Sequence, residues 1–90
     1  MKKLSIIGIG RLGLCFGLTL EKCGYDVVGV DINADYVDKL NSKDFTSDEE
    51  GVTEHLQAAT NFRATTNLTE AVVHSDVLFV IVATPSLPNG

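Results

Sequence analysis

Short apolar runs recur along the chain, and longer segments with apolar positions three or four residues apart lie between them. The runs Lys3–Ile7, Asp26–Asp31 and Val77–Val82 are rich in β-branched residues, so each is predicted to form a buried strand. A shorter strand is predicted at 61–66, NFRATT. Strands that are apolar on both faces are typical of a parallel sheet with helices on both sides.

A helix is predicted over Arg11–Cys23, between the first two strands, with Gly24 as its C-terminal cap. After the second strand, Asn33 is a favourable N-cap for a helix that buries Val37 and Leu40. The apolar positions of the first helix are Leu12, Cys15, Phe16 and Leu20.

The segment 41–51, NSKDFTSDEEG, is polar and acidic, and we expect it to be a loop. Within it, Ser47 and Glu50 have the spacing of a capping box, in which each residue bonds the backbone of the other. A helix that buries Val52 and Leu56 should therefore begin at the end of this loop.

Asn67 and Glu70 have the same capping spacing and predict a short helix before the last strand. The apolar residues of this helix are Leu68, Ala71 and Val72. Alternating strands and helices with right-handed crossovers make a doubly wound α/β unit. The sequence therefore predicts one Rossmann-like domain over residues 1–90, with strand order 3-2-1-4 and truncated after strand four.

Three glycines follow the first strand directly, in the stretch IIGIGRLG. In a G-x-G-x-x-G turn, Gly8 would make the tight turn, Gly10 would let a pyrophosphate approach the backbone, and Gly13 would let the helix pack close to the sheet. Asp31 ends the second strand 23 residues after Gly8, where a carboxylate can accept hydrogen bonds from the adenosine ribose. The alternative is a packing turn and a solvated acid, but strand, turn, helix and acid together favour a dinucleotide site.

The remaining polar residues give weaker evidence for a binding site or a metal site. Arg11 either pairs with a phosphate or faces solvent, since a cation opposes the dipole of a helix start. His55 and His74 have no ligand partners nearby in sequence, and we expect both at the surface. The acidic residues between 44 and 54 fit no calcium loop and are expected to be a solvated helix start. We therefore predict no metal site.

The net charge and the cysteines limit the classes of partner and the cellular compartment that fit this protein. The net charge of −5 argues against nucleic acid or an anionic membrane as partner, and no apolar run approaches the ~20 residues that span a bilayer. Cys15 and Cys23 would lie about 12 Å apart along one helix, beyond the reach of a disulfide, so both are expected to pack on the helix. The sequence favours a cytoplasmic protein.

The stretches SIIGIGRLGL, GYDVVGVDIN, NFRATTN and AVVHSDVLFVIVATP resemble the N-terminal domain of the UDP-glucose/GDP-mannose dehydrogenase family, over essentially all ninety residues. The chain has Arg11 where this family commonly has an aromatic residue and Tyr36 where it commonly has a lysine. DEEGV replaces the usual Glu-Pro-Gly-Leu at 48–52. The resemblance implies NAD as cofactor, with Arg11 and Thr84 near the phosphates. The predicted cofactor-binding residues are Gly8, Gly10, Arg11, Leu12, Gly13, Asp31 and Thr84.

Enzymes of this family oxidise nucleotide sugars to uronic acids with a cysteine nucleophile that lies in a later part of a longer chain. Neither Cys15 nor Cys23 matches that position, so the resemblance implies no catalytic residue here and an N-terminal fragment that is inactive alone. The sugar would be bound only through other domains. The alternatives are a non-catalytic dinucleotide-sensing regulatory domain and the cofactor domain of a 6-phosphogluconate-type dehydrogenase. The unpaired edge of Val77–Val82 predicts a homodimer.

Overall fold

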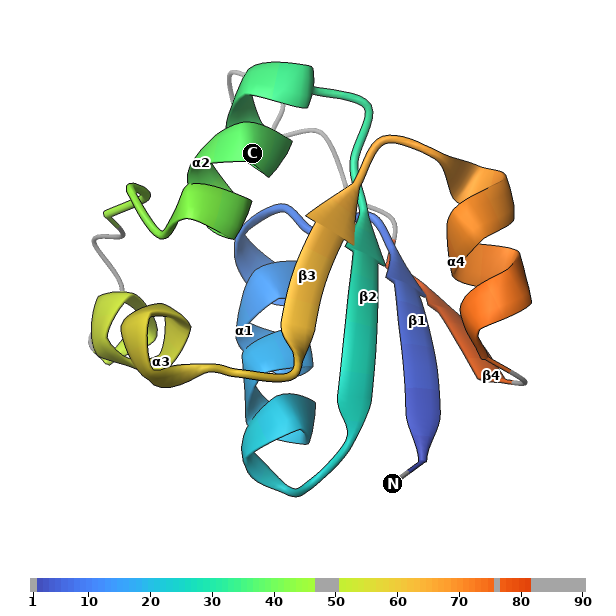
Figure 1. Cartoon of the computed structure of the whole chain (residues 1–90), viewed down its shortest axis with the longest axis horizontal. Helices are drawn as coiled ribbons and strands as arrows, with labels where there is room; N and C mark the ends of the chain where they lie inside the picture. The colour runs from blue at the N-terminus through green and yellow to red at the C-terminus, as the bar shows by residue number, and fades with distance from the viewer. Residues whose placement is uncertain (1, 47–50, 76, 82–90) are drawn as a thin grey trace, which may run out of the picture.

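A four-stranded parallel sheet with strand order β3-β2-β1-β4 forms the centre of the molecule, which confirms the predicted topology. The structure is a computed structural model, and it describes residues 2–46, 51–75 and 77–81. The strands are β1 (Lys3–Ile7), β2 (Asp26–Val30), β3 (Phe62–Thr65) and β4 (Val77–Val80). The helices are α1 (Arg11–Lys22), α2 (Ala34–Ser42), α3 (Val52–Ala58) and α4 (Leu68–His74). Figure 1 shows α4 on one face of the sheet and the other three helices on the opposite face.

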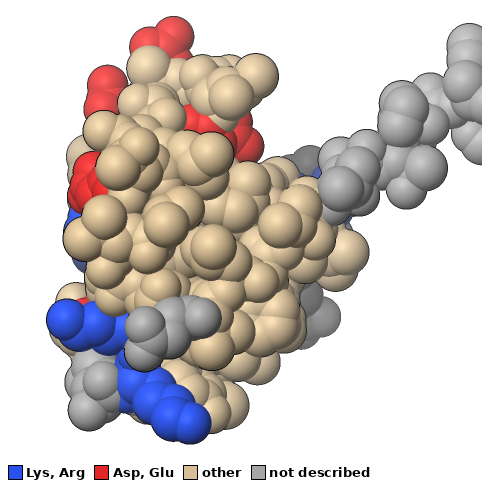
Figure 2. Space-filling model, turned by 90° about the vertical axis from the view of Figure 1, so that its right-hand side faces the viewer, with Lys and Arg blue, Asp and Glu red and all other residues tan. Residues whose placement is uncertain are grey.

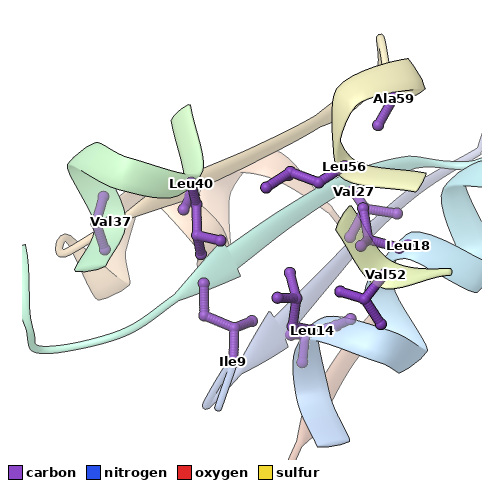
Figure 3. Packing of buried hydrophobic residues seen from close by; sticks show 11 residues of the cluster. Ile9, Leu14, Leu18, Val27, Val37, Leu40, Val52, Leu56 and Ala59 are labelled. Carbon is purple, nitrogen blue, oxygen red and sulfur yellow. The ribbon is translucent and has the colours of Figure 1, made fainter. Parts of the chain in front are cut away.

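The larger part of the core lies between the sheet and the face covered by α1, α2 and α3. Ile6 and Val27 of the central strands are fully buried there and meet Leu18 of α1, Leu40 of α2 and Leu56 of α3. Figure 3 shows these helices directing their apolar side chains toward the sheet and toward one another. On the other face, the smaller cluster of Val28, Val30 and Ala71 joins α4 to the sheet.

Two glycines determine which face of α1 packs on the sheet. A Cβ at Gly17 would lie 3.0 Å from Ile6 Cδ1 and 3.0 Å from Phe62 Cε2, so the helix approaches the sheet more closely than a larger residue would allow. The buried face is therefore Gly13, Leu14, Gly17 and Leu18. The predicted apolar face was displaced by about one position, since Leu12 is 69% exposed.

The helix α2 is longer than predicted and includes Asn41 and Ser42, which we had expected to belong to a loop. Its start is as predicted, because the Asn33 side chain accepts a hydrogen bond from the N–H of Tyr36. Its last turn is held by Asn41, whose amide donates to the carbonyl of Ala64 and accepts from the N–H of the same residue, both at 2.8 Å. Lys43 then ends the helix in the left-handed conformation.

The start of α3 follows Gly51, which has a φ of +84°, while the predicted capping pair Ser47 and Glu50 lies outside the described residues. Val52 and Leu56 are buried as predicted. The capping prediction for α4 is confirmed, because Asn67 accepts from the N–H of Glu70 at 3.2 Å. Within α4, Ala71 is fully buried.

Two side chains lie differently from their sequence predictions. His74 was expected at the surface, yet its side chain is only 7% exposed, because its ring packs at the start of β2 with Nε2 3.1 Å from the carbonyl oxygen of Asp26. Cys23 was expected to pack on the first helix, but α1 ends at Lys22 and Cys23 is exposed beyond it. Cys15 and Cys23 are both free thiols, as predicted.

The face formed by α4 and β4 exposes an unusual amount of apolar surface. Val73 is 79% exposed, Val80 is 65% exposed, and Leu68, Val72, Val77 and Leu78 are each exposed by more than two fifths. Figure 2 shows a broad area without charged side chains on this face. Among the described residues, no helix is long and apolar enough to cross a membrane. The predicted end of the last strand, at Val82, lies outside the described residues.

Candidate functional site

The carboxyl ends of β1 and β2 and the first residues of α1 and α2 meet at one end of the sheet, at the top of Figure 1. Parallel α/β sheets bind their ligands at this end, in the crevice where the chain leaves adjacent strands in opposite directions. Here β1 is flanked by β2 on one side and by β4 on the other, so the crevice lies beside the turn that follows β1.

Gly8 begins this turn, and the fold itself requires a glycine there. Its φ is +95°, a conformation that other residues rarely adopt, and its N–H donates to the carbonyl of Val30 at 2.9 Å. A Cβ at this position would lie 2.3 Å from the carbonyl oxygen of Ile81, just after β4. The predicted tight turn is therefore present and is enclosed by both neighbouring strands.

The other two glycines of the turn differ in what surrounds them. A Cβ at Gly13 would lie 2.0 Å from the carbonyl oxygen of Gly8, so only glycine lets α1 start this close to the turn. A Cβ at Gly10 would meet no atom within 4 Å, and its φ of −63° is open to any residue. The packing of the described chain thus accounts for Gly8 and Gly13 but not for Gly10.

Ile9 anchors the turn in the core. Its side chain is fully buried and fills the space above Gly29 in β2, where a Cβ would lie 2.5 Å from Ile9 Cγ2. Figure 3 shows the Ile9 side chain among Leu14, Leu40 and their neighbours. The sequence analysis did not single out Gly29, although a glycine inside an otherwise β-branched strand is a known sign of a close approach by another part of the chain.

Asp31 follows β2 at the same end of the sheet and is half-buried. Its N–H donates to the carbonyl of Thr65 at 3.1 Å, and its Oδ1 accepts from the N–H of Asn33 at 2.9 Å. The backbone of Asp31 is thus held by β3, and one carboxylate oxygen is held by the turn into α2. The next residue, Ile32, is 96% exposed.

A cavity of about 280 Å³ opens beside the turn, between the starts of α1, α2 and α3. It is lined by Gly10, Arg11, Leu14, Tyr36, Phe45, Thr46 and Val52. The rings of Tyr36 and Phe45 meet edge to face with centroids 5.4 Å apart. Burial, and secondarily the charge of Asp31, raises the pKa of Tyr36 to about 12. In the sequence, Tyr36 stands out only as a departure from a family pattern.

The structure brings most of the predicted cofactor-binding residues together. Gly8, Gly10 and Gly13 form the turn, Arg11 and Leu12 are exposed in the first turn of α1, and Asp31 ends the adjacent strand. Thr84 lies outside the described residues. Among residues 2–46, 51–75 and 77–81, no group of three or more histidine, cysteine or acidic side chains is placed to hold a metal ion.

These residues fit a dinucleotide. Gly10 is the N-cap of α1 and has no side chain to occupy the start of the helix, where backbone N–H groups and the helix dipole favour a phosphate. The open space at Gly10 lets a pyrophosphate lie against the backbone. Asp31, at the end of the next strand, can accept hydrogen bonds from ribose hydroxyls.

Comparisons with known proteins agree with this fit. GDP-mannose 6-dehydrogenase of Pseudomonas syringae pv. tomato is 37% identical over 91 residues, which cover 98% of this chain and 21% of the relative. A ternary complex of GDP-mannose dehydrogenase from Pseudomonas aeruginosa superposes with a TM-score of 0.85 at 34% identity, covering 97% of this chain and 21% of that one.

A UDP-glucose dehydrogenase from the archaeon Pyrobaculum islandicum superposes with a TM-score of 0.87 at 31% identity, over 98% of this chain and 21% of that one. The chain therefore spans about a fifth of the length of the relatives that it matches. The family model for the NAD-binding domain of the UDP-glucose/GDP-mannose dehydrogenases matches residues 2–90. With strand order, glycine turn and family model in agreement, this chain belongs to the UDP-glucose/GDP-mannose dehydrogenase family, and its residues 2–90 match the NAD-binding domain of that family.

Proposed function

We propose that this chain binds the adenosine and pyrophosphate portion of NAD and leaves the nicotinamide largely in water. The observation that carries the proposal is Gly10, a glycine that no contact within the described chain requires. A phosphate lying against the backbone would explain it. Gly8 and Gly13 shape the turn, Arg11 and Leu12 line the phosphate side, and Asp31 accepts the ribose hydroxyls. Thr84, outside the described residues, completes the proposed set.

We further propose that the chain is the N-terminal cofactor domain of a longer nucleotide-sugar dehydrogenase. Its relatives are named for GDP-mannose, UDP-glucose and UDP-N-acetyl-D-mannosamine. In such an enzyme, NAD would supply the hydride acceptor; converting the C6 hydroxyl of the sugar to a carboxylate removes two hydrides, so it would need two NAD molecules in succession and one water as the source of the second oxygen. The residues of this chain would hold and orient the cofactor, while sugar contacts and the nucleophile would come from other domains. We accordingly expect no turnover of a nucleotide sugar by this chain alone.

The binding proposal is tested by titrating NAD and ADP-ribose into the 90-residue chain and following the backbone amides of Gly10 and Asp31 by NMR. The two ligands should bind about equally, because losing the burial of the nicotinamide removes roughly 2–3 kcal/mol that NAD would otherwise gain. NAD binding more than about tenfold tighter than ADP-ribose would mean that this chain also holds the nicotinamide.

The Gly10→Ala variant gives the most direct additional test of the site. Its φ of −63° suits alanine and the added methyl meets no protein atom, so its stability should stay within about 1 kcal/mol of the wild type. Binding of both ligands should nevertheless weaken by about tenfold or more, because the methyl occupies the space proposed for the pyrophosphate. Unchanged affinity in a folded Gly10→Ala protein would remove the main support for the site.

We propose that Asp31 selects NAD over NADP. A 2′-phosphate beside this carboxylate would bring like charges close together in a partly wet site and cost on the order of 1–3 kcal/mol. Calorimetric titration of both cofactors into the wild type and an Asp31→Asn variant measures the difference. The preference for NAD should shrink in the variant. Equal affinity of the wild type for both cofactors would contradict this role.

We also propose that the isolated chain forms a homodimer through the free edge of β4, where Val80 is 65% exposed. A flat apolar edge without charge readily pairs with a second strand.

We propose a cytoplasmic location as well. The two free thiols, Cys15 and Cys23, suit a reducing compartment, and the chemistry of the family agrees with it.

A further inference from the structure

The hydroxyl of Tyr36 donates a hydrogen bond to the carbonyl oxygen of Ile9, 2.5 Å away, and so links α2 to the glycine turn. We propose that Tyr36 is a positioning residue, which fixes the peptide between Ile9 and Gly10 so that the Gly10 N–H is presented to a phosphate of the bound nucleotide. This inference rests on the proposed binding of NAD at the turn and names a residue that the binding motif does not include.

Tyr36 acts on a single peptide group, the one between Ile9 and Gly10. The described residues contain no cis peptide bond, and in a trans peptide the C=O and the N–H point in opposite directions. Because the oxygen of Ile9 is held by Tyr36 on the α2 side, the N–H of Gly10 must point away from α2. No described residue accepts a hydrogen bond from this N–H, and Gly10 itself is exposed. The donor is therefore oriented by the protein and available to a ligand.

Without Tyr36, this peptide would have fewer restraints than its neighbours. On the N-terminal side, the N–H of Gly8 donates to the carbonyl of Val30, and the side chain of Ile9 is buried in the core. On the other side, the carbonyl of Gly10 accepts from the N–H of Leu14 within α1. The Tyr36 hydroxyl supplies the remaining anchor, at the peptide whose N–H faces the proposed phosphate.

Tyr36 also connects the two halves of the proposed site. Asp31 accepts from the N–H of Asn33, and the Asn33 side chain accepts from the N–H of Tyr36 at 3.1 Å. Tyr36 in turn donates to Ile9. A continuous series of hydrogen bonds thus runs from the acid proposed to bind ribose to the turn proposed to bind phosphate. Burial raises the pKa of Tyr36 to about 12, and a tyrosine hydroxyl at or above its ordinary pKa of 10 keeps its proton at neutral pH and remains a donor.

The test compares Tyr36→Phe with Tyr25→Phe in the 90-residue chain. The chain has only these two tyrosines, and Tyr25 lies just beyond the far end of α1, away from the glycine turn. Both variants lose a hydroxyl and keep the ring. ADP and adenosine are titrated into each protein by NMR, and thermal unfolding shows that each remains folded. Adenosine carries no phosphate, so its binding does not use the Gly10 N–H.

We expect Tyr36→Phe to weaken ADP binding about three- to tenfold, the range for one net hydrogen bond, and to leave adenosine affinity within about twofold. The ADP-induced shift of the Gly10 amide should also shrink, and Tyr25→Phe should behave as wild type. Equal ADP affinity in wild type and Tyr36→Phe would overturn the role of Tyr36 while leaving nucleotide binding intact. Equal losses for ADP and adenosine would overturn it too, since they indicate a general distortion. A wild type that binds neither ligand would overturn the proposed function, and this inference with it.

Discussion

The two edges of the sheet are protected to different degrees. At the β3 edge, the outward-facing N–H and C=O of Ala64 are both bonded by the side chain of Asn41. The carboxylate of Glu21 accepts the N–H groups of Thr60 and Asn61 just before the same strand, each at 3.1 Å. At the β4 edge, no described strand follows, and Val80 is exposed to the extent of 65%.

The two edges therefore differ in whether side chains of the described chain already bond the outward-facing backbone groups. Asn41 and Glu21 act in place of a further strand, so the β3 edge offers few free backbone groups to another molecule. Within the described residues, the β4 edge combines apolar side chains with backbone groups that no further strand pairs, as expected for a strand inside a larger sheet. The relatives that this chain matches are about five times longer, and we propose that in a longer protein the sheet continues at this edge. Three experiments test this comparison.

The largest effect is expected from opening the β3 edge with Asn41→Ala. The variant removes both hydrogen bonds to Ala64 and should lower the free energy of unfolding by about 1–3 kcal/mol, as measured by urea denaturation. Asp38→Ala, at an exposed position of the same helix, is the control and should change the stability much less. A loss of stability in Asn41→Ala no larger than in Asp38→Ala would show that the paired bonds do not protect this edge.

A smaller effect is expected from closing the β4 edge with Val80→Lys. A lysine on a strand edge opposes pairing with a second strand, so the dimer dissociation constant should rise about tenfold, equivalent to about 1.4 kcal/mol. Sedimentation equilibrium measures this constant. Thr69→Lys on exposed α4 is the charge-matched control and should leave dimerisation unchanged. If the wild type is monomeric at high concentration, or if both variants act alike, the β4 edge is not the interface.

The smallest effect concerns Glu70, which joins α4 to the β3 edge. Hydrogen bonds from Arg63 and then Thr65 lower the pKa of its carboxyl from 4.5. A lowered pKa in the folded state means that the contribution to stability is present above pH 4.5 and disappears as the pH falls through the folded value. Glu70→Gln should therefore be slightly less stable than the wild type at pH 7, and this difference should shrink as the pH falls below 4.5. A difference that stays constant on acidification would assign the effect to packing instead of charge.

The sequence predicted the fold and the centre of the site because both depend on local patterns. Three apolar runs and a shorter strand at 61–66, with helical segments between them, indicate a parallel sheet and its strand order, and the spacing of Gly8, Gly10 and Gly13 places a turn before a helix. Asn33 and Asn67 were recognised as caps because a cap bonds a backbone group only three residues away.

The features that sequence reasoning missed depend on contacts between distant segments. Asn41 looked like a loop residue, since its role in the helix is to bond Ala64, 23 residues further along. His74 carries no local sign that its ring will meet the carbonyl of Asp26. The hydrogen bond from Tyr36 to Ile9 is likewise invisible until α2 is placed beside the turn. In α1, Gly13 and Gly17 are part of the buried face. The prediction from the spacing of apolar side chains missed them because glycine has no side chain.

The contact between Gly8 and Ile81 has a consequence for how the protein is made. The glycine turn belongs to the first residues synthesised, yet Ile81 packs against Gly8, and its N–H donates to the carbonyl of Ile7 at 2.8 Å. Contacts between residues so far apart in sequence form late in folding. A nascent chain emerging from the ribosome can thus assemble β1, α1 and β2 while its nucleotide-binding turn is still unsupported on one side. We expect it to acquire nucleotide affinity only after β4 has left the exit tunnel and docked.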